Sequence, residues 1–153
     1  MPFTTDSELD LLFPAEHIPD EARKQLHPDL HLRPLASTDY RRGHLSVLSV
    51  LTVVTDPGED AWATDRIVAV GTVFIERNVG HIEDIAVDKS QQGKKLGLRI
   101  IQTLTGISEN SGCYKTILNC SDSNIPFYQK CGYEKKENEM AKYAPERSRT
   151  PRL

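Results

Sequence analysis

The sequence has few cysteines and no long apolar run. Its 153 residues include only Cys113, Cys120 and Cys131, an odd number without a C-x-x-C spacing. This pattern argues against a disulfide framework and a zinc site, so we expect reduced thiols and no metal. No apolar run approaches the ~20 residues that cross a bilayer, and no signal segment opens the chain, so we expect a cytoplasmic protein without a membrane partner.

The chain also lacks a strong excess of either charge. It carries 19 Lys and Arg against 22 Asp and Glu, a net charge of −3, and its pI is about 5.9. This balance gives no general attraction to nucleic acid, so nucleic acid is not an expected partner and any anion must be bound by local geometry. The length and a hydrophobic content of 38% predict one globular domain with its own core.

Two nucleotide-binding motifs are missing. There is no G-x-G-x-x-G and no G-x-x-x-x-G-K-[ST], which disfavours NAD and ATP. Residues 80–107 nevertheless predict a strand, a turn rich in Gln, Gly and Lys, and a helix that begins near Gly93. The first N–H groups of such a helix have no intrahelical partner and its dipole favours negative charge, so phosphate is its natural ligand.

Periodicity and turn signals predict the other elements. They are a short helix at Pro19–Leu26, a strand at Leu30–Leu35, a helical face over residues 40–51, strands at Ile67–Glu76 and His81–Val87, a strand at Tyr114–Cys120, a short helix at Ile125–Lys130 and a polar final strand at Tyr133–Tyr143. The strands at 67–76 and 81–87 are expected to pair antiparallel as central strands. Residues 1–31 are predicted to form an N-terminal extension, residues 32–143 the domain, and residues 144–153 a disordered tail.

Three stretches together resemble the eukaryotic glucosamine-6-phosphate N-acetyltransferases of the GCN5-related N-acetyltransferase superfamily. They are Gly80–Val87 with the loop Gln92–Gly97, Gly112–Lys115, and Asn124–Tyr133. The resemblance, from about Leu32 to Lys142, implies an α/β (α+β) fold with a central mixed, mostly antiparallel sheet flanked by helices. It also implies acetyl transfer from acetyl-CoA to the 2-amine of glucosamine 6-phosphate, a step toward UDP-N-acetylglucosamine, in a homodimer with active sites at the subunit interface.

The resemblance implies a cofactor site on one strand and the loop after it. A bulge or splay at Ile85, Ala86 and Val87 would turn backbone N–H groups toward the acetyl group and the pantetheine. The pyrophosphate would lie on the loop formed by Gln92, Gly93, Lys94, Lys95, Leu96 and Gly97. Lys95 stands where the family has its central glycine. A lysine permits a narrower range of backbone dihedral angles than glycine, but it adds a cation.

The acceptor and catalytic residues are likewise implied by the resemblance. The sugar phosphate would contact Thr52, Glu83, Asp84, Ile85, Tyr114 and Lys115, with Tyr114 and Lys115 on opposite sides. Tyr128 would contact the cofactor and protonate the departing thiolate. Asn119, also beside the cofactor, replaces a carboxylate that orients or activates the amine, and an amide cannot act as a base. The base that takes the proton of the ammonium group would then be Glu83, Asp84, or backbone carbonyls acting through water. No base is needed if the enzyme captures an amine that is already neutral.

The chain departs from this family in two places. It looks shorter by on the order of twenty residues between Trp62 and Arg66, the length of one helix and one strand. A smaller loss falls between Asn78 and Gly80. We expect an incomplete chain, because a deleted sheet strand leaves backbone groups unpaired. An acetyltransferase acting on another amine and a non-catalytic interaction module remain alternatives.

Overall fold

The computed structural model describes residues 4–51, 66–136, 138 and 140–142. The chain divides into two compact units, Met1–Cys120 and Ser121–Leu153. The helices and strands of the first unit are α1 (Asp20–Lys24), α2 (His44–Leu48), β1 (Ala69–Glu76), β2 (Val79–Val87), α3 (Leu96–Asn110) and β3 (Lys115–Leu118), with short 3-10 turns at Asp6–Glu8, Ala15–His17, Asp39–Arg42 and Lys89–Gln91.

The sheet of the first unit has the order β1-β2-β3. β1 and β2 form the predicted antiparallel hairpin, and the turn between them places Arg77 and Asn78 at φ of 49° and 61°. Two consecutive positive φ values match the turn type that best follows the twist of a hairpin. β3 pairs parallel with β2, from Val79 opposite Lys115 to Ile82 opposite Leu118. The sheet is therefore mixed, as predicted.

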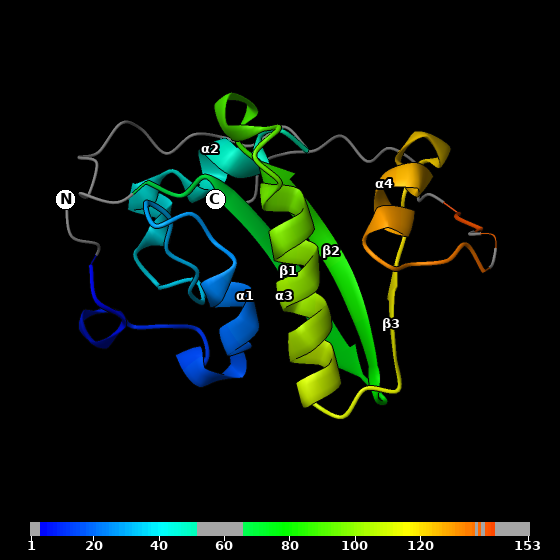
Figure 1. Ribbon diagram of the computed structural model, residues 1–153, viewed down its shortest axis with the longest axis horizontal. Coiled ribbons are helices and arrows are strands. Elements are labelled where there is room, and N and C mark those ends of the chain that lie inside the picture. The colour runs from blue at the N-terminus through cyan, green and yellow to red at the C-terminus, as the bar shows by residue number, and fades with distance from the viewer. Residues whose placement is uncertain (1–3, 52–65, 137, 139, 143–153) are drawn as a thin grey trace. The chain divides into compact units, whose positions relative to one another are not determined.

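Helix α3 covers one face of β1 and β2 (Figure 1). Its apolar stripe is buried through Leu96, Ile101, Leu104 and Ile107. Close approach is possible because the sheet presents glycine: a Cβ at Gly71 would lie 2.6 Å from a side-chain carbon of Ile100. This contact fixes the start of α3 relative to the sheet.

The opposite face packs on the segment before β1. Val47 of α2 forms a buried cluster with Val70 of β1 and Ala86 of β2. The helix predicted over residues 40–51 is interrupted there, because Gly43 has φ of 84° and separates the 3-10 turn from α2. Tyr40 and Leu51, which were expected on the buried face, are exposed.

Three strand predictions were wrong within the described part of the chain. Leu30–Leu35 forms no strand; the only pairing nearby is an isolated bridge between Leu11 and Ala36. Of Tyr133–Tyr143, no described residue is in a strand, since none of them pairs with another strand. β1 lies at the edge of the sheet that the described residues form, not at its centre, because among them only β2 pairs with it.

The second unit contains α4 (Ile125–Lys130), preceded by a 3-10 turn at Asp122–Asn124. Pro126 lies at the start of the helix, and Gly132, with φ of 92°, follows its end, as the sequence predicts. The ring of Tyr128 makes edge contacts with Phe127, at 5.1 Å between centroids, and with Tyr133, at 6.4 Å.

Candidate active site

A β-bulge interrupts the β1–β2 ladder near the end of β2. Val70 pairs with Ala86 and Thr72 with Glu83, so Asp84 and Ile85 together oppose Gly71. Asp84 adopts a left-handed backbone conformation at the bulge, with φ of 55°. A bulge of this kind redirects a strand and leaves one residue unpaired. It lies at Asp84–Ile85, so it begins one residue before the predicted stretch Ile85–Val87 and includes the first residue of that stretch.

β2 also separates from β3 beyond this point. The parallel ladder ends at Ile82 opposite Leu118, whereas β2 continues to Val87. The Asp88 N–H donates, at 2.8 Å, to the carbonyl of Val68, the residue directly before β1. Because successive N–H groups of a strand point to opposite sides, the Val87 N–H points away from β1, into the gap. Asn119, which is exposed, follows the end of β3 on the other side of that gap.

The loop after β2 is fixed by Asp88. Its Oδ1 accepts from the backbone N and the hydroxyl of Ser90, at 2.8 and 2.6 Å, and its Oδ2 accepts from Arg66 at 2.6 Å. The hydrogen bonds from Ser90 and, to a smaller extent, the charge of Arg66 lower the pKa of Asp88. A carboxylate held ionised in this way caps the 3-10 turn at Lys89–Gln91 and directs the chain toward α3.

Helix α3 begins at Leu96, later than the predicted start near Gly93. Gly93 has φ of 80° and Lys95, which precedes the helix, φ of 61°. No side chain caps this end of the helix. The N–H groups of its first turn are therefore left for an external acceptor, and the helix dipole favours a negative one. Lys94 and Lys95 are exposed beside it, with Lys94 Nζ donating to Gln91 at 2.6 Å.

Two of the predicted acceptor residues, Glu83 and Lys115, lie on the sheet face opposite α3, whereas the side chain of Ile85 lies on the α3 face beside Ile100. Val79, His81 and Glu83 alternate on this face of β2, and Lys115 lies directly opposite Val79 in β3. Glu83 and Lys115 are thus on one face, about four residues or ~13 Å apart along the strand direction. Both side chains are exposed, and they can act on two ends of one small molecule.

Tyr114 and Lys115 do not lie on opposite sides as predicted. Lys115 Nζ lies 5.6 Å from the centroid of the Tyr114 ring, over its face. The Tyr114 N–H donates to the Asn78 carbonyl at 2.9 Å, which brings the backbone of Tyr114 beside the β1–β2 turn. A cation over an aromatic face is attracted to the ring, so Tyr114 holds the ammonium group of Lys115 near the acceptor face.

Two predicted site residues cannot be placed relative to the others. Thr52 lies outside the residues that the structure describes. Tyr128 belongs to the second unit, and its predicted role toward the thiolate stays a prediction. The residues that the structure does bring together are those around the bulge, the loop before α3, and the two strands β2 and β3.

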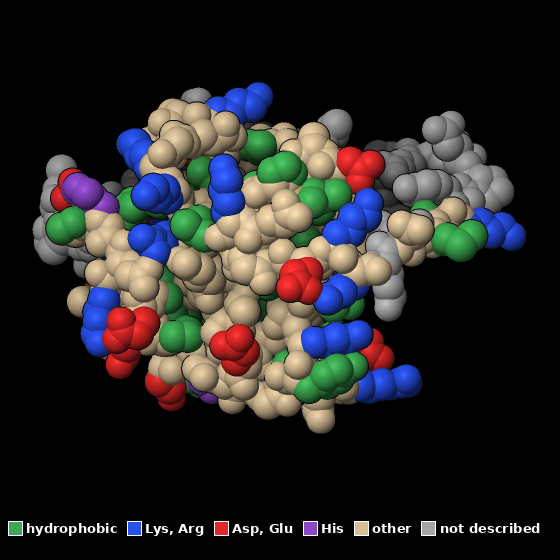
Figure 2. All heavy atoms as spheres, turned by 45° about the vertical axis from the view of Figure 1, so that its right-hand side comes forward, with side chains coloured by type: hydrophobic (Ala, Val, Ile, Leu, Met, Phe, Trp, Pro, Cys, Tyr) green, Lys and Arg blue, Asp and Glu red, His purple; other side chains and the backbone are tan. Residues whose placement is uncertain are grey.

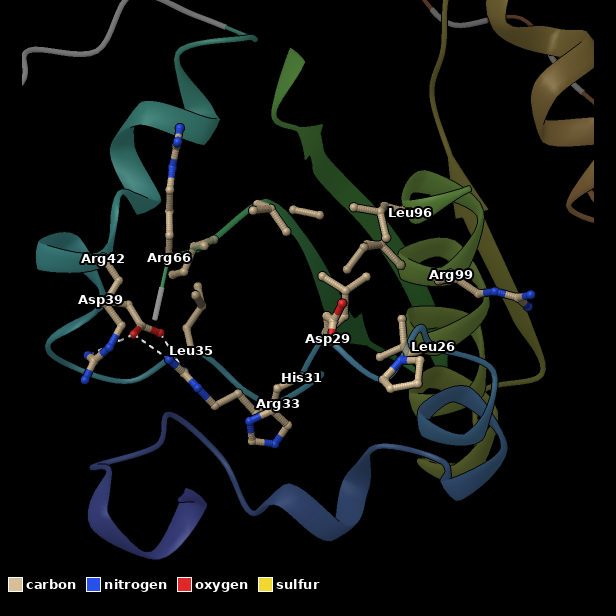
Figure 3. Close-up of a pocket in the computed structure, with 16 residues that line it drawn as sticks. Leu26, Asp29, His31, Arg33, Leu35, Asp39, Arg42, Arg66, Leu96 and Arg99 are labelled. Atoms are coloured by element: carbon tan, nitrogen blue, oxygen red, sulfur yellow. Dashed lines mark hydrogen bonds and ion pairs between the residues drawn. The ribbon is translucent and has the colours of Figure 1, made fainter. Parts of the chain in front are cut away.

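Sequence reasoning missed a cavity of about 600 Å³ beside the first residues of β1. Segments 26–35 and 66–69 and the first turns of α3 line it, and Figure 3 shows Asp39 on one side with Arg33 and Arg42 bound to it. Asp39 accepts two hydrogen bonds from Arg33, at 2.7 and 2.8 Å, and one from the Ala36 N–H, at 2.8 Å. No periodicity in the sequence signals this cluster, which joins the N-terminal segment to α2.

The environment of Asp39 sets its charge. Burial alone would raise the pKa of this carboxyl, but the hydrogen bonds from Arg33 and Ala36 and the charges of Arg33 and Arg42 lower it below its ordinary value of 3.8. The nearby His44 is shifted by burial, which lowers its pKa below 6.5 against the opposing charge of Asp39. Both groups support the fold rather than the site around the bulge.

In the part of the chain that the structure describes, no group of three or more His, Cys, Asp or Glu side chains is arranged to hold a metal ion. Nor is any helix there long and apolar enough to cross a membrane. On the face that Figure 2 presents, Lys and Arg side chains lie among Asp and Glu side chains.

Comparison with known proteins assigns the family. Residues 18–133 match the Acetyltransferase (GNAT) family. A crystal structure of glucosamine-6-phosphate N-acetyltransferase from Arabidopsis thaliana superimposes with a TM-score of 0.64 at 36% identity, over 72% of this chain and 95% of that one. A Trypanosoma brucei acetyltransferase gives a TM-score of 0.60 at 32% identity, over 76% and 100%. The chain therefore belongs to the GNAT acetyltransferases and has their fold.

Relatives with an assigned activity narrow the similarity further. The glucosamine 6-phosphate N-acetyltransferase of Candida albicans is 38% identical over 130 residues, which cover 67% of this chain and 87% of that protein. The Arabidopsis thaliana protein of the same name is 36% identical over 141 residues, covering 73% and 95%. This chain is thus similar to glucosamine 6-phosphate N-acetyltransferases over most of their length.

Proposed function

We propose that this protein transfers the acetyl group of acetyl-CoA to the 2-amine of glucosamine 6-phosphate. The observation that carries the proposal is the combination of a splayed β2 end with Glu83 and Lys115 on one sheet face. The similarity to glucosamine 6-phosphate N-acetyltransferases supports the choice of acceptor.

Acetyl-CoA is bound by the backbone more than by side chains. The first turn of α3 offers uncapped N–H groups to the pyrophosphate, and Gly93 leaves open space above the loop. The Val87 N–H faces the gap between β2 and β3, where it can donate to the pantetheine or to the thioester carbonyl. A donor aimed at that carbonyl stabilises the oxyanion that forms when the amine attacks.

The sugar phosphate lies along the face opposite α3. Lys115, held over Tyr114, binds the phosphate, and Glu83, beside the bulge, accepts a hydrogen bond from the 2-amine. The amine attacks the thioester carbon, the carbon–sulfur bond breaks, and the thiolate takes a proton from Tyr128 or from water. Asn119 orients the amine but takes no proton, so Glu83 or Asp84, directly or through water, receives the proton of the ammonium group.

Release of free CoA thiol tests the proposal directly. The purified chain should release CoA from acetyl-CoA with glucosamine 6-phosphate, much more slowly with unphosphorylated glucosamine, and not with spermidine or a lysine peptide. Faster release with either of those amines would assign another acceptor. Acetyl-CoA binding without release from any amine would indicate a non-catalytic module.

Lys115→Ala tests whether Lys115 binds the phosphate group of the acceptor. A charge-assisted hydrogen bond contributes about 1.5–3 kcal/mol, so this change should lower kcat/KM for glucosamine 6-phosphate by more than about tenfold. Activity with glucosamine should change little, because that acceptor has no phosphate for Lys115 to bind. Lys94→Ala is the matched control: it removes a lysine from the cofactor loop and should raise the KM for acetyl-CoA instead. Equal losses with both sugars would remove Lys115 from the phosphate site.

A further inference from the structure

Two exposed apolar side chains lie on the sheet face opposite α3, in one row across the three strands. Phe74 of β1 is the cross-strand partner of His81 in β2, and His81 is the partner of Ile117 in β3. Phe74 is 56% exposed and Ile117 is 38% exposed. A single exposed apolar side chain needs no explanation, but two in one row form a surface that a ligand can cover.

Charged groups of opposite sign lie at the two ends of this surface. Glu83 lies two residues from His81 along β2 toward the bulge, and Lys115 lies in the next row on the same face toward the β1–β2 turn. Glu76 shares the row of Lys115, and Arg77, at 3.8 Å, offsets part of its charge. A ligand with a cation at one end and an anion at the other therefore fits along β2.

The spacing of the strands leaves room for one sugar ring between the two apolar side chains. Neighbouring strands lie about 4.8 Å apart, so the backbones at Phe74 and Ile117 are separated by about 10 Å. Sites for small ligands are lined mostly by apolar and aromatic side chains, while a few polar groups fix the orientation. Glu83 and Lys115 supply the polar groups here.

We propose that Phe74 and Ile117 flank the pyranose ring of the acceptor and contact its apolar C–H groups. The ring then lies over His81, with its amino group toward Glu83 and its phosphate toward Lys115. Phe74 and Ile117 are specificity-determining residues, because they favour a cyclic acceptor over a flexible amine. This assignment rests on the proposed function.

The test compares the KM for glucosamine 6-phosphate and for glucosamine in wild type and in Phe74→Ala. Both sugars have the same ring, so loss of the phenyl group should raise both KM values by a similar factor, about five- to tenfold. Lys115→Ala, in contrast, should affect only the phosphorylated sugar. The KM for acetyl-CoA and Tm should change little, because Phe74 is exposed and lies outside the cofactor loop. Phe74→Leu should retain most of the affinity.

Ile75→Ala is the matched control. Ile75 is the next residue of β1 and is 47% exposed, but it lies on the α3 face, because its partner Gly80 faces Ser108 of α3. Its replacement should leave the KM values of both sugars unchanged. Unchanged KM values in Phe74→Ala, an increase for the phosphorylated sugar alone, or the same increase in Ile75→Ala would overturn the proposal.

Two further measurements distinguish this inference from the proposed function. The Kd for glucosamine 6-phosphate, measured by calorimetry, should rise in Phe74→Ala by the same factor as the KM. Wild type that binds this sugar but releases no CoA with it would overturn the proposed function alone, whereas absence of binding would overturn both. A change of mass in sedimentation of Phe74→Ala would assign the row to an interface between two copies of the chain and overturn the ring site.

Discussion

Lys95 is held in a backbone conformation that suits glycine. Its φ of 61° lies in the left-handed region, where a residue with a Cβ is strained by about 1–2 kcal/mol. The loop keeps that conformation because the chain must turn from Gly93 into α3. A lysine at this position therefore adds a cation beside the helix N-terminus while it strains the turn.

Lys95→Gly separates these two effects. Relief of the strain, partly offset by the flexibility of glycine in the unfolded chain, should raise the free energy of unfolding by about 0.5–1 kcal/mol, or Tm by about 2–4 °C. Loss of the cation should raise the KM for acetyl-CoA. Lys94→Gly is the control, since Lys94 is not at positive φ and its replacement relieves no strain. A lower Tm for Lys95→Gly would show that the turn is not strained.

Asp39 and His44 make stability depend on pH in the same direction. The pKa of each is lower in the folded chain than in the unfolded one, so the unfolded chain takes up the proton first as the pH falls. The contribution of His44 is lost from about pH 6.5 downward, and that of Asp39 below about pH 3.8. Urea unfolding at pH 8, 6.5 and 5 should show a decline in wild type that is smaller in His44→Gln. The same decline in both proteins would contradict the assignment to His44.

At the scale of single residues, the sequence predicts best those conformations that neighbouring residues in the chain determine. Gly93 was expected where the turn meets the helix, and it has positive φ; Lys95 also has positive φ, although the helix was expected to begin before it. The cluster of Asp39 with Arg33 and Arg42 was not predicted. Its members meet through tertiary packing of an irregular segment, for which neither periodicity nor a motif gives a signal.

At the scale of elements, the hairpin and α3 followed from the sequence because each finds its partners nearby in the chain. β1 meets β2 across two turn residues, and the apolar stripe of α3 packs on the same two strands. The segments Leu30–Leu35 and Tyr133–Tyr143 have compositions that a strand tolerates. A strand, however, needs a neighbour to accept its hydrogen bonds, and a propensity does not show whether that neighbour exists.

Gly71→Ala tests the packing between α3 and the bulge. A Cβ there would lie 2.6 Å from Ile100 Cγ2, 2.6 Å from Ile85 Cδ1 and 2.9 Å from Leu104 Cδ1. Such overpacking should lower the free energy of unfolding by about 1–3 kcal/mol in urea unfolding. It should also reduce acetyl transfer, since Ile85 belongs to the bulge. Gly112→Ala is the control: there φ is 81° but no atom lies within 4 Å, so only backbone strain acts. Retained activity in Gly71→Ala would uncouple the bulge from this contact.

At the scale of the whole molecule, the dimer stays a prediction. It was inferred from a final strand that needs a partner, and the described residues of 133–142 form no strand in the single chain. Pairing with a second copy would give this segment a neighbouring strand. Sedimentation velocity at micromolar concentration should therefore give the mass of two chains. A monomer with full activity would contradict the prediction.

The role of Tyr128 as the acid toward the thiolate stays a prediction. Tyr128 lies on α4, where its ring contacts Phe127 and Tyr133. A phenol, with an ordinary pKa near ~10, can protonate a departing thiolate at little energetic expense.

Tyr128→Phe keeps the ring and its packing and removes only the hydroxyl. It should lower kcat by about 10²–10⁴ while the KM for acetyl-CoA and Tm change little, because the lost interaction exists only when the thiolate leaves. Tyr133→Phe is the matched control, since its ring contacts the same residue but its hydroxyl has no assigned proton to give. A similar loss of kcat in both variants, or a loss accompanied by unfolding, would make Tyr128 a packing residue. Solvent would then be the source of the proton.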